Sequence, residues 1–211
     1  GAVDDPDRET LVHSFGVQTM KPFAESEPCV QWTLHNEQPI YVNTVTLVND
    51  GGFHHSNWMA VPEDKFKGDD GYFNCDDRNY TELEAAVAGT VVFAQSTQSR
   101  DEVQQLPPGV VVKIPPKHKI IAGVHLLNLG STDLDSELRM ALEIVHPRLV
   151  EVVVAPFRFS YFDLHIPAKQ RTRHQASCEF ADEYVAAVGG ARLPAPSART
   201  FPALPAKSRA V

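Results

Sequence analysis

Three histidines are the residues of this sequence whose type and placement best suit metal chemistry. His54 and His55 are adjacent and follow Gly51-Gly52-Phe53, and His125 interrupts the apolar run from Ile120 to Leu127. Imidazole is the commonest side-chain ligand for copper and zinc, and three imidazoles leave coordination positions open to a small molecule. The sequence therefore predicts a metal site composed of His54, His55 and His125.

The adjacent histidines need an unusual backbone to serve one ion. Neighbouring residues of a regular strand point to opposite faces of a sheet, so His54 and His55 can converge only where the chain bends. The Gly51-Gly52 pair supplies a source of such a bend, because glycine tolerates the backbone angles of a bulge or sharp turn. His125 lies among core residues, where a buried imidazole needs a partner that a metal would provide.

Taken singly, each part of this trio has a plainer interpretation. The doublet alone is typical of a solvated loop, and His125 alone is typical of a core histidine that bonds to a carbonyl. Side chains expected in the core rather than at a metal are Trp58, Met59 and Met140. The histidines interpreted as structural or surface residues are His35, His118, His146, His165 and His174. His118 precedes His125 by an odd number of residues, which predicts the opposite face of a regular strand.

The composition excludes several classes of partner. The chain has 211 residues and a net charge of −8, without a basic stripe that could neutralise phosphates, so neither nucleic acid nor an anionic membrane is expected as a partner. No apolar stretch reaches the roughly 18 residues that span a bilayer. The cysteines Cys29, Cys75 and Cys178 are not spaced as Cys-x-x-Cys metal knuckles, and one disulfide plus one odd thiol is their simplest interpretation.

Short apolar and alternating segments dominate the chain and predict an all-β fold. The segments interpreted as strands are 30–34, 40–48, 89–94, 110–114, 120–127, 139–145, 149–154 and 157–162. Turn-forming residues separate them at 106–109 and 128–131, a spacing that favours an antiparallel β-sandwich. Residues 81–88 are the only plausible helix. Residues 186–211 are rich in proline and alanine and are expected to form a disordered tail.

The order of these motifs resembles a known family. Cys29 on an early strand is followed by His54-His55, by the segment 72–76 that contains Cys75, by Leu106-Pro107-Pro108-Gly109 and by the strand that carries His125. This order is similar to that of the copper type II, ascorbate-dependent monooxygenases, the group of peptidylglycine α-hydroxylating monooxygenase and dopamine β-monooxygenase. The resemblance implies a jelly-roll domain over residues 1–150, in which His54, His55 and His125 bind the copper called CuH and Cys29 pairs with Cys75.

The resemblance continues into the start of a second sandwich and then breaks. Residues 159–180 look like its opening strands, so residues 151–185 are expected to be an incomplete second domain. The family then has a His-x-His pair, and later a methionine, which hold the second copper, CuM. This chain has Leu193 and Ala195 in that region and no histidine after His174. The second copper site is therefore not expected in this chain.

The resemblance implies a copper-dependent monooxygenase-family protein. Its one copper would transfer electrons from ascorbate for the O2-dependent hydroxylation of a small molecule or peptide, although the chain without CuM ligands is not expected to hydroxylate by itself. The alternatives are a non-catalytic copper-binding or electron-transfer module and a metal-free β-sandwich used for binding. Zinc is a second choice of metal, because copper ranks higher in the affinity series. If Cys29 and Cys75 pair, the protein belongs in an oxidising compartment, as a secreted or periplasmic protein.

Overall fold

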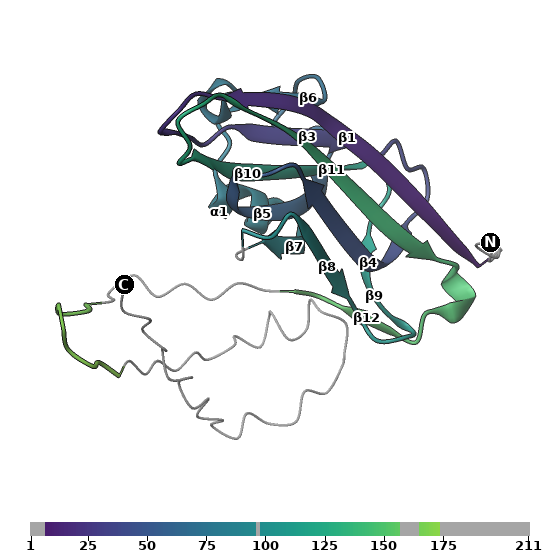
Figure 1. The fold of residues 1–211 in the computed structure, drawn as a ribbon. Helices are drawn as coiled ribbons and strands as arrows, with labels where there is room; N and C mark the ends of the chain where they lie inside the picture. The colour runs from purple at the N-terminus through teal and green to yellow at the C-terminus, as the bar shows by residue number, and fades with distance from the viewer. Residues whose placement is uncertain (1–6, 96–97, 157–164, 174–211) are drawn as a thin grey trace, which may run out of the picture. The chain divides into compact units, whose positions relative to one another are not determined.

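The protein is an all-β sandwich, as the sequence predicts. The computed structural model describes residues 7–95, 98–156 and 165–173. The chain divides into two compact units, residues 1–157 and residues 158–211. The sandwich belongs to the first unit, and Figure 1 shows its strands in two layers. In the second unit the described residues 165–173 form no strand or helix.

The first sheet has six strands and is built around β4 (Ile40–Asn49). In spatial order its main path is β1 (Arg8–Met20), β11 (Leu134–Val145), β4, β9 (Val110–Ile114) and β12 (Val152–Val154), and β8 (Asp101–Gln105) also pairs with β4. Its pairs are antiparallel except for β9 and β12, which run parallel. The short parallel strand β12 thus ends the described part of this sheet.

The second sheet carries the candidate metal ligands. Its order is β6 (Gly71–Phe73), β3 (Cys29–Thr33), β10 (His118–Asn128), β5 (Phe53–Pro62) and β7 (Thr90–Gln95), and β2 (Ala24–Ser26) also pairs with β10. Every pair in this sheet is antiparallel. The central strands β10 and β5 bring His125 and the histidine doublet side by side. The jelly-roll connection of the strands stays a prediction.

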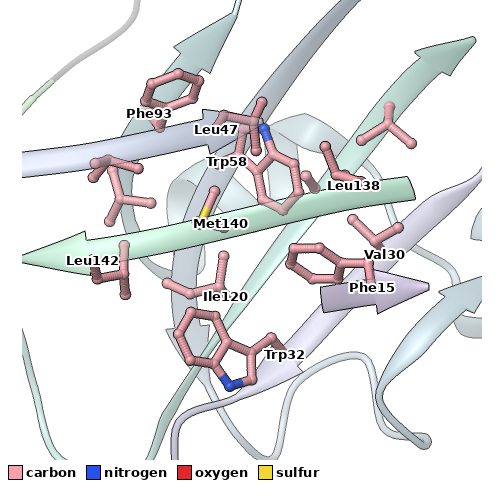
Figure 2. Close-up of a cluster of buried hydrophobic side chains, with 14 of the residues drawn as sticks. Phe15, Val30, Trp32, Leu47, Trp58, Phe93, Ile120, Leu138, Met140 and Leu142 are labelled. Carbon is pink, nitrogen blue, oxygen red and sulfur yellow. The ribbon is translucent and has the colours of Figure 1, made fainter. Parts of the chain in front are cut away.

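Inward-facing side chains of the two sheets form the main core. Leu47 and Met140 from the first sheet and Trp58 from the second are fully buried, and Figure 2 shows them in one layer between the strands. The Trp58 indole donates a hydrogen bond to Ser56 Oγ over 2.8 Å, which satisfies its buried N–H. The predicted core positions of Trp58, Met59 and Met140 are therefore confirmed, although Met59 packs on the other face of the second sheet.

A second, smaller apolar cluster covers the outer face of the second sheet. It consists of Cys29, Met59, Val61, Tyr80, Ala85 and Ile121. The short 3-10 helix η1 (Cys75–Arg78) and the helix α1 (Glu82–Ala88) lie over this face, and α1 packs against β5. Thr81 caps α1 by accepting a hydrogen bond from Glu84 N–H at 3.2 Å, so the helix predicted at 81–88 is present.

A disulfide joins this covering segment to the sheet. Cys29 of β3 and Cys75 of η1 are bonded, which confirms the predicted pairing. Cys178 lies outside the described residues, as do the strand predicted at 157–162, most of the expected second sandwich and the tail at 186–211. Within the described residues, no helix is long and apolar enough to cross a membrane.

Several strands were not predicted, and β1 shows why. It is an edge strand with much of its length exposed, so few apolar residues mark it. Its register against β11 also shifts between Ser14 and Val17, where Gly16 has a φ of 84°. This bulge breaks the alternation of Leu11, Phe15 and Met20, the three apolar side chains that β1 turns toward the core.

Candidate metal centre

A β-bulge places the two adjacent histidines on the same side of the second sheet. His55 of β5 faces His125 of β10, but the next pair in the register is Phe53 with Leu126, so His54 is the extra residue. A bulge of this kind lets two neighbouring side chains avoid opposite faces. The bend that convergence of His54 and His55 requires is therefore present in the structure.

The two glycines before the bulge have backbone angles that other residues rarely adopt. Gly51 has a φ of 122° and Gly52 a φ of 76°. A Cβ on Gly52 would lie 2.3 Å from Met20 Cε, so the Met20 side chain would have to shift to admit another residue here. The Gly52 carbonyl accepts a hydrogen bond from Leu127 N–H at 2.7 Å, which joins β5 to β10 again beyond the bulge. Gly51-Gly52 therefore shapes the entry into the doublet.

The three imidazoles form a compact cluster. Ring centroids are 5.2 Å apart for His54 and His55, 5.0 Å for His54 and His125, and 4.6 Å for His55 and His125. Each ring offers one nitrogen such that the three atoms lie within 4.8 Å of one another. Nitrogens on one tetrahedral ion are about 3.4 Å apart, given metal–nitrogen bonds of about 2.05 Å. Side-chain shifts of about 1 Å would therefore close the cluster around an ion.

His125 links the cluster to two carboxylates. Its Nδ1 lies 2.9 Å from His55 Nε2, and its Nε2 is hydrogen-bonded to Glu25 Oε1. Glu27 Oε1 lies farther away, at 4.0 Å from the same Nε2. The side chain of His125 is only 12% exposed, so these partners compensate for most of its lost contact with water.

The ring nitrogens of His54 and His55 are in states that favour the binding of a cation. His54 Nδ1 is buried and has no hydrogen-bond partner within the part of the chain that the structure describes. An unsatisfied buried nitrogen is costly, and coordination would remove the cost. Partial burial, and then the charges of His125 and His54, lower the pKa of His55, an effect that Glu82 and Glu27 oppose. A lowered pKa favours neutral imidazole, which is the form that binds metals.

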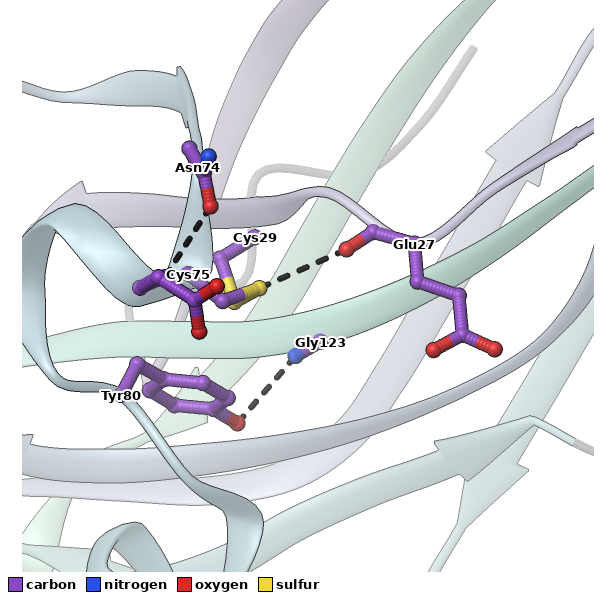
Figure 3. Close-up of a disulfide and its surroundings, with 7 residues drawn as sticks. Glu27, Cys29, Asn74, Cys75, Tyr80 and Gly123 are labelled. Carbon is purple, nitrogen blue, oxygen red and sulfur yellow. Dashed lines mark hydrogen bonds between the residues drawn. A yellow bond between two sulfur atoms is a disulfide. The ribbon is translucent and has the colours of Figure 1, made fainter.

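A pocket of about 260 Å³ opens beside two of the histidines. Its lining includes His55 and His125 together with Glu27, Cys75, Tyr80, Thr81, Glu82, Gly123 and Val124. Gly123 N–H donates to Tyr80 Oη at 3.1 Å, and Figure 3 shows this bond beside the disulfide. A Cβ on Gly123 would project toward Tyr80 and Glu82, at 3.6 and 3.9 Å from their nearest atoms. A side chain at this position would therefore make ordinary van der Waals contacts and take up part of the pocket.

Two other histidines of the first unit, His118 and His146, lie apart from the cluster. His118 belongs to the same strand as His125, but residues between them alternate, with Ile120 in the main core and Ile121 in the outer cluster. His118 therefore belongs to the other face, and its Nδ1 lies 2.8 Å from the Pro116 carbonyl oxygen. His146 Nδ1 accepts a hydrogen bond from Arg148 N–H at 3.2 Å. His174 is outside the described residues.

Sequence reasoning missed the carboxylates near this site and one histidine that packs against the main core. Glu25, Glu27 and Glu82 come from segments with no recognisable spacing to the histidines, so no local pattern marks them. His13 was also not singled out; its ring stacks on Trp32 with centroids 4.9 Å apart and planes at 4°. The pairing of distant strands, and for Glu82 the packing of α1 on the sheet, brings these residues next to their partners.

The fold and the cluster define an all-β sandwich protein with a candidate three-histidine metal centre. No protein-family model and no curated protein matches the sequence. Among solved structures, it is similar to one titled "Structure of infectious bursal disease virus Gx strain", with 8% identity and a TM-score of 0.27 over 66% of this chain and 32% of that chain. The chain thus spans about a third of the length of that chain. A likeness of this degree carries no argument about topology or function.

Proposed function

We propose that the chain binds one copper ion through His54, His55 and His125 and serves as the electron-transfer site of a copper type II monooxygenase-like protein. The observation that supports this most is the bulge, which turns two adjacent imidazoles toward a third, together with the buried Nδ1 of His54 that has no described partner. Packing alone does not account for three clustered imidazoles, one of which has a buried nitrogen without a described hydrogen-bond partner.

The donor set fits copper. Imidazole nitrogen is a ligand for copper in both of its common oxidation states, and copper stands above zinc in the affinity series for divalent ions. When bound, copper supplies one-electron chemistry. The protein's part is to hold the three nitrogens, to keep the proton of His125 on Nε2, where it is donated to Glu25, and to leave a pocket beside His55 for the electron donor, with ascorbate proposed from the family resemblance.

The non-catalytic copper-binding or electron-transfer module is the second candidate. It is favoured by Leu193 and Ala195, which stand in the region where the family has the His-x-His pair of its second copper site. Ascorbate-dependent oxygen uptake separates the two candidates. An enzyme consumes O2 in proportion to hydroxylated small-molecule or peptide product, whereas a module whose copper is reduced by ascorbate and reoxidised by O2 forms no hydroxylated product.

Copper titration of the purified chain tests the site. We expect one Cu2+ per chain, with an electron paramagnetic resonance spectrum that shows nitrogen ligands. The double variant His54→Ala/His125→Ala is expected to lose this spectrum, and His118→Ala is the matched control that keeps it. An unchanged spectrum in the double variant refutes the assignment. Elemental analysis after reconstitution that finds neither copper nor zinc would favour a metal-free binding domain instead.

The disulfide bears on where the protein works. Cys29 and Cys75 are bonded, and such bonds persist in oxidising compartments. A secreted or periplasmic location is therefore part of the proposal. Mass spectrometry of the protein from its native source, alkylated before reduction, tests it: free thiols at both positions would contradict this location.

A further inference from the structure

Glu25 reaches the candidate metal centre from a strand of only three residues. β2 pairs with β10 so that Glu25 faces Leu127, and Leu127 lies on the same face of β10 as His125. The Glu25 carboxylate is therefore a diagonal neighbour of His125 and accepts a hydrogen bond from its Nε2. The Glu25 side chain is 60% exposed and that of His125 12%, so an exposed carboxylate contacts a largely buried imidazole.

This contact sets the direction of two hydrogen bonds. An ionised carboxylate can only accept, so a neutral His125 must carry its proton on Nε2, and its Nδ1 is left with a lone pair. That Nδ1 lies 2.9 Å from His55 Nε2. In the metal-free protein His55 Nε2–H must then donate to His125 Nδ1. The lone pair of His125 Nδ1 consequently faces His55, on the cluster side of the ring.

We propose that Glu25 is a positioning residue that holds His125 in the Nε2–H form and thereby aims its Nδ1 at the metal. This inference rests on the proposed copper site and adds to it a residue outside the three ligands. A carboxylate that accepts the N–H of a ligating histidine fixes the ring and raises its basicity, and removing such a partner costs about 10–100-fold in metal affinity.

Glu27 provides a matched comparison. It is two residues from Glu25 and carries the same charge, but its Oε1 lies 4.0 Å from His125 Nε2, too far for a hydrogen bond, and its side chain is 74% exposed. Glu25→Ala and Glu27→Ala each remove one negative charge near the same nitrogen. Only Glu25→Ala removes the hydrogen bond, so the two variants separate positioning from simple electrostatic attraction.

The affinity experiment uses Cu2+ and Zn2+ alone as probes, in competition with a chelator. We expect Glu25→Ala to bind each ion about 10–100-fold more weakly than the unmodified chain. Glu27→Ala is expected to lose about fivefold or less, as for an exposed charge. Glu25→Gln keeps an oxygen acceptor and should fall between Glu25→Ala and the unmodified chain. Equal losses for Glu25→Ala and Glu27→Ala overturn the inference.

A second measurement needs no metal. The 15N chemical shifts of the His125 ring distinguish a proton on Nε2 from one on Nδ1. We expect the Nε2–H form in the unmodified chain and in Glu27→Ala, and a mixture of forms in Glu25→Ala. A His125 that carries its proton on Nδ1 in the unmodified chain overturns the inference. If the unmodified chain binds neither ion, the proposed function itself fails, and the 15N shifts still report whether Glu25 controls His125.

Discussion

The disulfide between Cys29 and Cys75 is expected to supply a large share of the stability of the sandwich. The two cysteines are 46 residues apart in sequence. Closing a loop of that length in the unfolded chain removes enough conformational entropy to raise the free energy of unfolding by about 4 kcal/mol at 25 °C. The free energy of unfolding of small domains is only about 5–15 kcal/mol in total, so this one bond accounts for a large fraction of it.

The disulfide attaches the segment that covers the outer face of the second sheet. Cys29 has no exposed surface and packs in the outer cluster with Met59, Val61 and Ile121. Cys75 begins η1, the segment that leads to α1 and to the pocket wall at Tyr80. Without the bond, the covering segment is held only by apolar contacts and a few hydrogen bonds. We therefore expect it to open before the rest of the sheet does.

Urea unfolding of the Cys29→Ala/Cys75→Ala variant measures the effect. Both proteins should carry Cys178→Ser, so that no other thiol can exchange. The expected loss is about 4 kcal/mol in the free energy of unfolding. The corresponding fall in Tm is about 8–16 °C. Reduction of the unmodified disulfide should produce a similar change. A loss below about 1 kcal/mol would refute the reasoning, because it would mean that the bond does not restrict the unfolded chain.

Three further predictions concern stability. Burial lowers the pKa of His13 despite the opposing charge of Asp70. The contribution of neutral His13 to the free energy of unfolding is therefore fully present above about pH 6.5. It decreases as the pH falls toward the pKa of His13 in the folded protein. The urea midpoint of His13→Phe should decline less between pH 7.5 and 5, and an equal decline would contradict this. Gly89→Ala places a Cβ 2.0 Å from the Ala60 carbonyl oxygen, so a loss of about 3 kcal/mol is expected in urea unfolding, and a neutral result would disprove the clash. Asn128→Ala removes an amide that donates to three backbone carbonyls, at 2.9 to 3.1 Å, and should cost about 3 kcal/mol by the same assay; under 1 kcal/mol would show that water replaces them.

Most strands that could be predicted from sequence have a pattern that reflects burial, although β5, which is buried along most of its length, was not among those predicted. β10 is apolar on consecutive residues because its inner face meets the main core and its outer face meets the cluster under α1. β4 is recognisable for the same reason, with buried residues along most of its length. β1 and β8 could not be recognised, because strands with much exposed surface need few apolar residues.

The histidine cluster could be predicted because its information is local. Two adjacent histidines after two glycines indicate a bend. A histidine inside a core strand indicates a buried imidazole that requires a hydrogen-bond partner or a metal ion. The carboxylates could not be predicted, since Glu25 reaches His125 only through the pairing of β2 with β10. Glu82 similarly depends on α1 being held over the sheet, where it accepts a hydrogen bond from Asn57 Nδ2 at 3.0 Å.

The alternation of β5 and β10 separates the site from the main core. Trp58 and Val124 face inward, whereas His55 and His125, on the same two strands, face outward. His55 is exposed and His125 is largely buried, but neither histidine belongs to an apolar cluster, so replacing them removes no side chain from the apolar core. Variants of the histidines should therefore fold with nearly unchanged cores. A lost copper signal in such variants can then be attributed to missing ligands rather than to unfolding, provided that their near-ultraviolet circular dichroism, which reports on Trp58, matches that of the unmodified chain.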